Sequence, residues 1–159
     1  MRIGMMSDSH GDMQAIDEVL KRAGKIDLWL HAGDCLPDAR YLSLKSQTKV
    51  VAIAGNCDWP GPAAKEMETV QVGDLRIFLT HGHLFGVNFG LEALVKAAAG
   101  EQCTFAVYGH THVARDIQSG AVRVLNPGSI SRPRGGGPAS FMILEMHAGK
   151  IHTDLIELI

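Results

Sequence analysis

The chain has 159 residues, 46% hydrophobic and 20% charged, a length that predicts one compact domain over residues 1–159 with a core that needs no disulfides. The formal net charge of −2, with lysine and arginine scattered along the chain, argues against binding to duplex nucleic acid but does not exclude a small nucleotide-like substrate. No apolar run is long enough to span a bilayer and no secretory signal is visible, so we expect a cytoplasmic protein without membrane contacts.

The first third of the chain alternates strand and helix patterns. Short apolar runs at residues 2–7, 26–31 and 49–54 predict three buried strands. Residues 13–20 carry apolar side chains at helical spacing, and Gly24 follows as a stop signal. Such alternation predicts parallel strands that are joined by crossover helices.

The pattern changes in the rest of the chain, where hairpins dominate and one helix is expected. The predicted elements are strands 68–72 and 75–79, helix 91–99, strand 105–108, strands 115–118 and 121–125, and strands 140–146 and 151–158. The three strand pairs are joined by short turns that contain glycine. Together the two parts predict an α/β fold of the α+β kind, with two packed mixed β-sheets and α-helices outside.

A polar cluster follows each of five predicted strands, and each cluster combines Asp, Asn or His with a glycine. The clusters are Asp8-Ser9-His10-Gly11-Asp12, His31-Ala32-Gly33-Asp34, Gly55-Asn56-Cys57-Asp58, Thr80-His81-Gly82-His83 and Gly109-His110-Thr111-His112. Because ligands of open α/β sheets gather at the carboxyl ends of the strands, we expect the five clusters to converge on one point.

The donor atoms in these clusters are typical of a site for divalent metals. Carboxylate, amide and imidazole donors suit Mn²⁺, Ni²⁺, Fe²⁺, Zn²⁺ or Mg²⁺, and many histidines beside an aspartate that can bridge suggest two ions. Residues two apart after a strand face the same side, so Asp8 and His10 point together, as do His110 and His112. One such motif is weak evidence, whereas five in order indicate a metal site.

In this order the motifs D-x-H, G-D, G-N-x-D, H-G-H and G-H-x-H resemble those of the calcineurin-like metallophosphoesterase superfamily, specifically its small prokaryotic phosphodiesterase branch. The resemblance extends from Asp8 to residues 126–129. It implies a four-layer metallophosphoesterase fold with a dinuclear site. The implied ligands are Asp8, His10 and His112 for the first metal ion, Asn56, His81 and His110 for the second, and Asp34 as the bridge.

The resemblance also implies a hydrolase that cleaves phosphoric diesters with a hydroxide activated by two metal ions, Mn²⁺ being the first candidate. Two cations roughly 3.5–4 Å apart clamp the attacking and leaving oxygens of an in-line displacement. Bound metal lowers the pKa of water from about 15.7 towards roughly 7. No covalent intermediate is required, and we expect Asp58 to orient a neighbouring group.

One position departs from the pattern of many superfamily members, which have a histidine directly after the asparagine to protonate the leaving oxygen. Here that position is Cys57, as is often the case in the small prokaryotic branch. Losing general acid catalysis typically costs about 10²–10⁴-fold. We therefore expect faster turnover of activated aryl diesters than of alkyl monoesters, with Cys57 beside the substrate and His83 as a substitute acid.

Each candidate also has a plain structural interpretation. Asp8 is a suitable N-cap for the following helix, Asp34 is a suitable turn residue before Pro37, and Gly55-Asn56 is a common turn pair. The position of these residues in an ordered series favours the ligand interpretation for all three. Cys57 is by default a small side chain that fills space.

Other polar residues are expected to have structural roles. We expect His31 to be buried and hydrogen-bonded, His147 and His152 to be exposed, and Cys35 and Cys103 to lie in the core; three cysteines without CxxC spacing indicate neither disulfides nor a thiolate zinc site. Arg132 or Arg134, in a glycine-rich loop expected to be mobile, could pair with a phosphate or be solvated.

Two functions of other classes remain open at this stage. One is a non-catalytic, metal-binding scaffold of the same fold, similar in outline to the retromer subunit, and the other is a metal-bound nucleotide sensor. The complete set of candidate donors favours catalysis. Trp59, Leu84, Phe85 and Phe89 could form a patch for a homo-oligomer or pack into the core.

Overall fold

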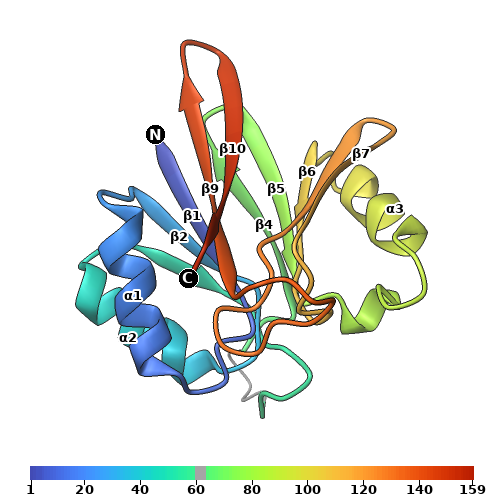
Figure 1. Ribbon diagram of the computed structural model, residues 1–159. Coiled ribbons are helices and arrows are strands. Elements are labelled where there is room, and N and C mark those ends of the chain that lie inside the picture. Colours follow the sequence, from blue (N-terminus) through green and yellow to red (C-terminus); the bar gives the residue numbers. More distant parts are fainter. Residues whose placement is uncertain (60–63) are drawn as a thin grey trace.

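A computed structural model of the protein describes residues 1–59 and 64–159 (Figure 1). The elements are β1 (Arg2–Met6), α1 (Met13–Ala23), β2 (Leu28–His31), α2 (Leu36–Ser46), β3 (Val50–Ala52), β4 (Met67–Val72), β5 (Leu75–Thr80), the 3₁₀ turn η1 (His83–Phe85), α3 (Glu92–Gly100), β6 (Phe105–Val107), β7 (Arg115–Ser119), β8 (Val122–Asn126), β9 (Ser140–His147) and β10 (Lys150–Glu157). The strands form two mixed sheets, as the sequence predicts, and each sheet has five strands.

The first sheet has the strand order β10-β9-β1-β2-β3. β1, β2 and β3 are parallel; β9 pairs antiparallel with β1, and β10 pairs antiparallel with β9 at the edge of the sheet. Alternate residues of β1 face opposite sides of the sheet. Ile3 and Met5 point into the core between the sheets. Gly4 lies against the Trp29 ring on the outer face, where a Cβ would collide with the indole.

The second sheet has the order β4-β5-β6-β8-β7, in which β5, β6 and β8 are parallel and the two edge strands are antiparallel. Its inner face meets the first sheet through buried aliphatic side chains such as Ile77, Leu79, Val107 and Leu125. This apolar layer holds the sheets face to face, because removing such side chains from water is favourable.

Helices cover both outer faces, which gives four layers in the order helix, sheet, sheet, helix (Figure 1). α1 and α2 pack on the first sheet, where Ile16 and Leu42 meet Trp29 and Phe141. α3 packs on the second sheet through residues that include Leu94. The four-layer arrangement expected from the resemblance is therefore confirmed.

The sequence did not predict α2. The helix begins after Cys35, which adopts a left-handed backbone (φ 94°), and its first turn contains Pro37, a residue tolerated only near a helix start. It buries few apolar side chains, so its helical pattern is weak, and Leu44 is 72% exposed. Two expected strands are shorter than predicted by two or more residues, beginning at Leu28 instead of 26 and covering only Val50–Ala52 instead of 49–54.

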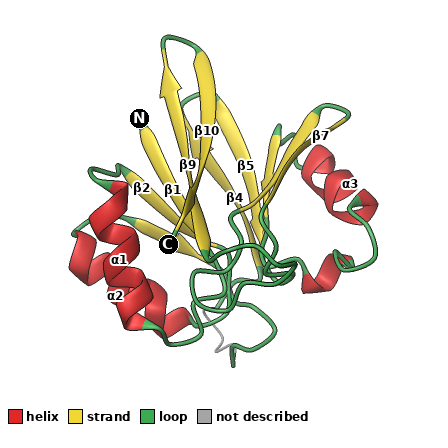
Figure 2. Cartoon of the chain, in the orientation of Figure 1, coloured by secondary structure: helices red, strands yellow, loops and turns green. Residues whose placement is uncertain are grey.

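The longer loops of both sheets gather at one end of the sandwich, below the strands in Figure 2. This end holds the carboxyl ends of β1, β2, β3, β5 and β6, after which the five polar clusters follow. In the part of the chain that the structure describes, no helix combines the length and apolar character that crossing a membrane requires.

Candidate metal centre

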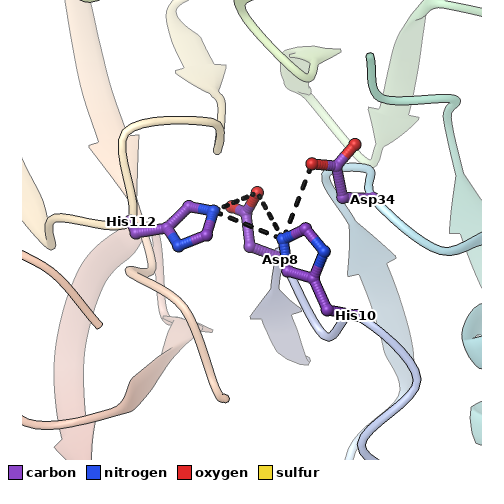
Figure 3. A group of neighbouring side chains, drawn as sticks. All are labelled: Asp8, His10, Asp34 and His112. Atoms are coloured by element: carbon purple, nitrogen blue, oxygen red, sulfur yellow. Dashed lines mark hydrogen bonds and ion pairs between the residues drawn. The ribbon is translucent and has the colours of Figure 1, made fainter. Parts of the chain in front are cut away.

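Four side chains from three loops point at one another at this end of the sandwich (Figure 3). We call Asp8, His10, Asp34 and His112 the inner cluster; one ligand atom from each lies within 4.8 Å of the other three. His112 Nε2 is 3.2 Å from Asp8 Oδ1 and 3.4 Å from His10 Nε2. His10 Nε2 is 3.7 Å from Asp34 Oδ2. Residues that are distant in sequence therefore share one small space.

Asp8 is fully buried, and only one of its carboxylate oxygens is hydrogen-bonded. Oδ2 accepts a hydrogen bond from the His110 backbone N–H at 3.0 Å, whereas Oδ1 has no hydrogen-bond partner. Burying a carboxylate oxygen without a partner costs free energy unless a cation neutralises it. The orphaned Oδ1 faces the imidazoles of His112 and His81, at 3.2 and 3.8 Å.

The backbone at these positions is strained. Asp8, His10, Asp34, His110 and His112 all have positive φ angles, between 48° and 67°. Non-glycine residues rarely adopt this left-handed conformation, and such strain concentrates at functional sites. The left-handed backbone at each position turns the donor side chain away from the direction it would have in a continuing strand. Placing these five side chains therefore lowers the stability of the fold.

Gly33 shows why glycine stands beside a donor. Its φ is +98°, and a Cβ there would lie 2.6 Å from His81 Nδ1. Any side chain at this position would displace His81 and strain the turn that presents Asp34.

Three further candidates form what we call the outer trio: Asn56, His81 and His110. Asn56 Oδ1 lies 2.9 Å from His81 Nε2 and 3.0 Å from His110 Nδ1. His81 also lies 3.4 Å from Asp34 Oδ2, so it connects the trio to the inner cluster. All seven side chains that the sequence singled out as metal ligands thus meet in one region.

Backbone carbonyls fix two of the imidazoles. His81 Nδ1 donates to the Ala32 carbonyl at 2.7 Å, and His112 Nδ1 donates to the Arg132 carbonyl at 2.6 Å. In the neutral form of each ring, this leaves the Nε2 lone pair directed at the carboxylates of Asp8 or Asp34. A lone pair that faces a carboxylate needs a cation between them, and metal-binding histidines are typically oriented in this way.

The pKa shifts follow from the same geometry. Burial alone would raise the pKa of the Asp34 carboxyl, but the His81 ring at 3.4 Å and a hydrogen bond from the Cys57 backbone N–H hold that pKa well below its usual range. Burial opposes the charged form of His81, but the nearby carboxylates of Asp34 and Asp8 outweigh it and raise the pKa of His81. The Asp8 carboxylate, 3.2 Å from His112 Nε2, raises the pKa of His112, whereas burial lowers the pKa of His10. The centre therefore favours added positive charge.

These residues fit one or more divalent cations. The donor set consists of carboxylate, imidazole and amide atoms, which suit Mn²⁺, Ni²⁺, Fe²⁺, Zn²⁺ or Mg²⁺. The orphaned oxygen of Asp8 and the facing imidazole nitrogens supply an electrostatic reason for a cation here.

Asp58 connects the two loops that carry Asp34 and Asn56. Its carboxylate accepts four backbone N–H groups, from Asp34, Cys35, Leu36 and Gly55, at 2.8 to 3.2 Å. These bonds hold the two loops together, and the orienting role expected of Asp58 stays a prediction.

The Cys57 side chain is exposed, and its backbone N–H donates to Asp34 Oδ1 at 3.0 Å. Partial desolvation of the thiol and the nearby charge of Asp34 raise the pKa of Cys57. The thiol is therefore a weak proton donor at neutral pH. Asn56 Nδ2 lies 3.7 Å from its sulfur, so the thiol lies beside the outer trio.

His83 lies beside the outer trio, with its ring centroid 5.4 Å from that of His81 and 6.2 Å from that of His110. Burial lowers the pKa of His83. Its Nδ1 is buried and has no hydrogen-bond partner. The role of His83 as a substitute acid therefore stays a prediction, because a lowered pKa favours the neutral ring.

Arg132 lies on the other side of the inner cluster, in a pocket lined also by His10. Its loop, expected to be mobile, is fastened to the centre. Ser129 Oγ and Ser131 Oγ donate to the Asp8 carbonyl at 2.8 and 3.0 Å. The Arg134 N–H donates to the His112 carbonyl at 3.0 Å.

Several plain interpretations can now be decided. Asp12, and not Asp8, caps α1, by accepting a hydrogen bond from the Ala15 N–H at 2.9 Å. His31 is buried and lies 3.0 Å from Ser9 Oγ, as expected. Cys103 is buried, but Cys35 is partly exposed and so is not a core residue.

The remaining surface residues are also placed. His147 and His152 are exposed. Phe85 packs against Phe78, with ring centroids 5.8 Å apart, whereas Trp59, Leu84 and Phe89 are exposed.

Sequence reasoning missed Asn88. Its Nδ2 donates to His110 Nε2 at 3.1 Å and so gives that ring a partner on the side away from Asn56. Asparagine is common in loops, and residues 86–90 follow no metal-ligand spacing, so no sequence pattern pointed to it.

Comparison with known proteins adds independent evidence. The sequence model of the calcineurin-like phosphoesterase superfamily domain matches residues 1–149. The phosphodiesterase YfcE of Escherichia coli (strain K12) is 34% identical over an alignment that covers 91% of this chain and 88% of YfcE.

Solved structures agree. A conserved uncharacterized protein of Streptococcus pneumoniae TIGR4 superimposes with a TM-score of 0.83 at 34% identity, covering 98% of this chain and 88% of that one. Vps29 of Entamoeba histolytica, solved with Zn²⁺, gives a TM-score of 0.77 at 22% identity and 99% coverage of both chains, which indicates a shared fold only.

Proposed function

The chain belongs to the calcineurin-like phosphoesterase superfamily, and on this premise we propose that it is a phosphodiesterase that works with two divalent ions, Mn²⁺ being the first candidate. Membership supports hydrolysis of phosphate esters in general. The preference for diesters and the number of ions are our proposal.

The observation that carries the proposal is the buried, unpartnered Oδ1 of Asp8 within the inner cluster. A protein that used this end only for packing would gain stability by replacing that carboxylate with a neutral group. Its presence among three imidazole nitrogens supports a cation site at this end of the sandwich.

The seven candidate ligands divide naturally into two sets. Asp8, His10 and His112 would hold one ion, and Asn56, His81 and His110 would hold the other. Asp34 lies between the sets, with Oδ2 at 3.7 Å from His10 Nε2 and 3.4 Å from His81 Nε2. It is the carboxylate that would contact both ions.

When bound, the ions supply positive charge that makes water a stronger nucleophile and neutralises the phosphoryl oxygens. Groups of the protein itself position the candidate ligands and the substrate. Ala32 and Arg132 carbonyls hold the His81 and His112 rings in place, and Asp58 holds the Asp34 loop. Arg132, exposed beside His10, would pair with a phosphate oxygen of the substrate.

Departure of the leaving oxygen needs a proton or a weakly basic leaving group. The Cys57 thiol has a raised pKa and is a poor donor. His83, half-buried beside His81, would be the alternative donor. We therefore expect activated aryl diesters to react faster than alkyl monoesters.

The test is turnover by protein that has first been stripped of metal with a chelator. Adding Mn²⁺ should restore hydrolysis of bis(p-nitrophenyl) phosphate, and two metal ions per chain should be found by elemental analysis. Absence of turnover with each of Mn²⁺, Ni²⁺, Fe²⁺, Zn²⁺ and Mg²⁺ would overturn the enzymatic proposal and leave a metal-binding scaffold as the alternative.

A further inference from the structure

A groove of about 730 Å³ begins beside the candidate metal centre and lies between the loop at residues 87–92 and β7. Two of its lining residues connect it to the centre. Asn88 donates to His110 Nε2 at 3.1 Å, and Thr111 stands between His110 and His112 in the chain. The volume is that of a site for a small molecule, about 300–1,000 Å³. A substrate whose phosphate sits at the centre can therefore extend into the groove.

The charged residues that line the groove are Arg115, Arg134 and Glu92. The carboxylate of Glu92 lies against the backbone of Gly90, where a Cβ would collide with it. Two arginines against one glutamate make the lining positive, and the planar guanidinium group is suited to the oxygens of a phosphate.

Arg134 is held in position by the centre itself. Its backbone N–H donates to the His112 carbonyl at 3.0 Å, and His112 Nδ1 donates to the Arg132 carbonyl at 2.6 Å. One candidate ligand thus fixes both ends of a three-residue segment. The backbone from which the Arg134 side chain extends therefore keeps a fixed position relative to the metal centre.

Phe89 gives the same groove an aromatic surface. Its side chain is 97% exposed, although burying a phenylalanine side chain away from water is favourable. Exposed aromatic rings in nucleotide-binding proteins serve as stacking surfaces for bases. A ligand with a planar ring and an additional anionic group would use both Phe89 and the arginines.

We propose that this groove binds the leaving-group side of the substrate and selects a nucleotide, with its base on Phe89 and a second phosphate at Arg115 and Arg134. The inference rests on the proposed phosphodiesterase function, because it names the substrate class of that site. The preferred substrates are then dinucleotides that carry a terminal phosphate in addition to the phosphodiester.

Binding can be tested without any chemistry, with adenosine 5′-monophosphate and adenosine as probes and a chelator present. We expect calorimetry to give at least tenfold tighter binding of the monophosphate, and R115A/R134A to remove that difference. F89A should weaken both probes, and Arg40→Ala, an exposed arginine of α2, should change neither affinity. Equal affinity of the two probes for the wild-type protein would overturn the proposal.

Turnover separates this proposal from the one on which it rests. With Mn²⁺, the 5′-phosphorylated dinucleotide pApA should give kcat/KM about tenfold or more above that of ApA, and R115A/R134A should abolish the ratio. Hydrolysis of both dinucleotides at equal rates would sink the groove proposal and keep the phosphodiesterase. Arginine-dependent binding of the monophosphate without any hydrolysis would support the groove proposal and overturn the phosphodiesterase proposal.

Discussion

The inner cluster and the outer trio differ in how far their side chains satisfy one another. Asn88 and Asn56 lie within hydrogen-bond distance of the two ring nitrogens of His110, at 3.1 and 3.0 Å. In the inner cluster, Asp8 Oδ1 is buried, makes no hydrogen bond and faces the Nε2 atoms of His112 and His81 at 3.2 and 3.8 Å. His110 of the outer trio can thus exist as a neutral ring with both nitrogens hydrogen-bonded, whereas the inner cluster is electrostatically incomplete without a cation.

Because of this difference, the inner cluster and the outer trio should bind metal ions with different affinities. A cation at the inner cluster removes a desolvation penalty that the fold already carries. A cation at the outer trio has to displace existing hydrogen bonds of Asn56 and His110. We therefore expect tighter binding at the inner cluster.

The largest effect should come from D8N, which removes the charge of the inner cluster. Losing several kcal/mol of charge stabilisation lowers kcat/KM by about 10³-fold or more. The metal-free variant should nevertheless be more stable than the metal-free wild type by about 1–3 kcal/mol, because an amide replaces an orphaned carboxylate.

Thermal unfolding with and without Mn²⁺ measures both sides of this prediction. D12N is the matched control, since asparagine caps a helix as well as aspartate does. If metal-free D8N is less stable than the metal-free wild type, then the buried Asp8 carboxylate does not destabilise the fold.

The next largest effect should come from the loss of Asp58, which connects the Asp34 loop with the Asn56 loop. D58A leaves four backbone N–H groups of the Asp34 and Asn56 loops without their acceptor. A loss of about 3 kcal/mol is expected, which lowers the melting temperature by about 6–12 °C. Misplacement of the ligands should reduce kcat about 10²-fold. Wild-type kcat in D58A would exclude a positioning role for Asp58.

N56A tests the comparison directly, because it removes the oxygen shared by His81 and His110 and leaves the inner cluster intact. Metal content should fall from two ions per chain to one, and activity by about 10–100-fold. N56D keeps an oxygen at this position and should retain the second ion. Loss of both ions in N56A would mean that the inner cluster and the outer trio do not bind metal ions independently.

The smallest effect is expected for C57H, which supplies an imidazole at the edge of the outer trio. It should raise the rate for an alkyl diester about tenfold relative to an aryl diester, because only the alkyl leaving group needs a proton. C57S removes the thiol without adding an acid, and its ratio should equal that of wild type. An unchanged ratio in C57H would place the acid elsewhere, and H83Q then becomes the informative variant.

The sequence by itself determined the layers of the fold and the chemistry of the centre. Hydrophobic runs of β1, β2, β5 and β6 are local signals, and a donor after each strand end is visible as a motif because strand direction fixes where the chain emerges. Short-range patterns therefore sufficed to locate five donor clusters, and the resemblance to the calcineurin-like superfamily selected seven candidate ligands among them.

Only the tertiary structure decided how these donors are paired. α2 has too weak a helical pattern to be seen, yet it follows directly on the loop that Asp58 fastens. The contact of Asn88 with His110, the orphaned oxygen of Asp8 and the groove beside Arg134 arise between segments far apart in the chain. Pairing and burial are properties of packing, so no local pattern of residues can encode them.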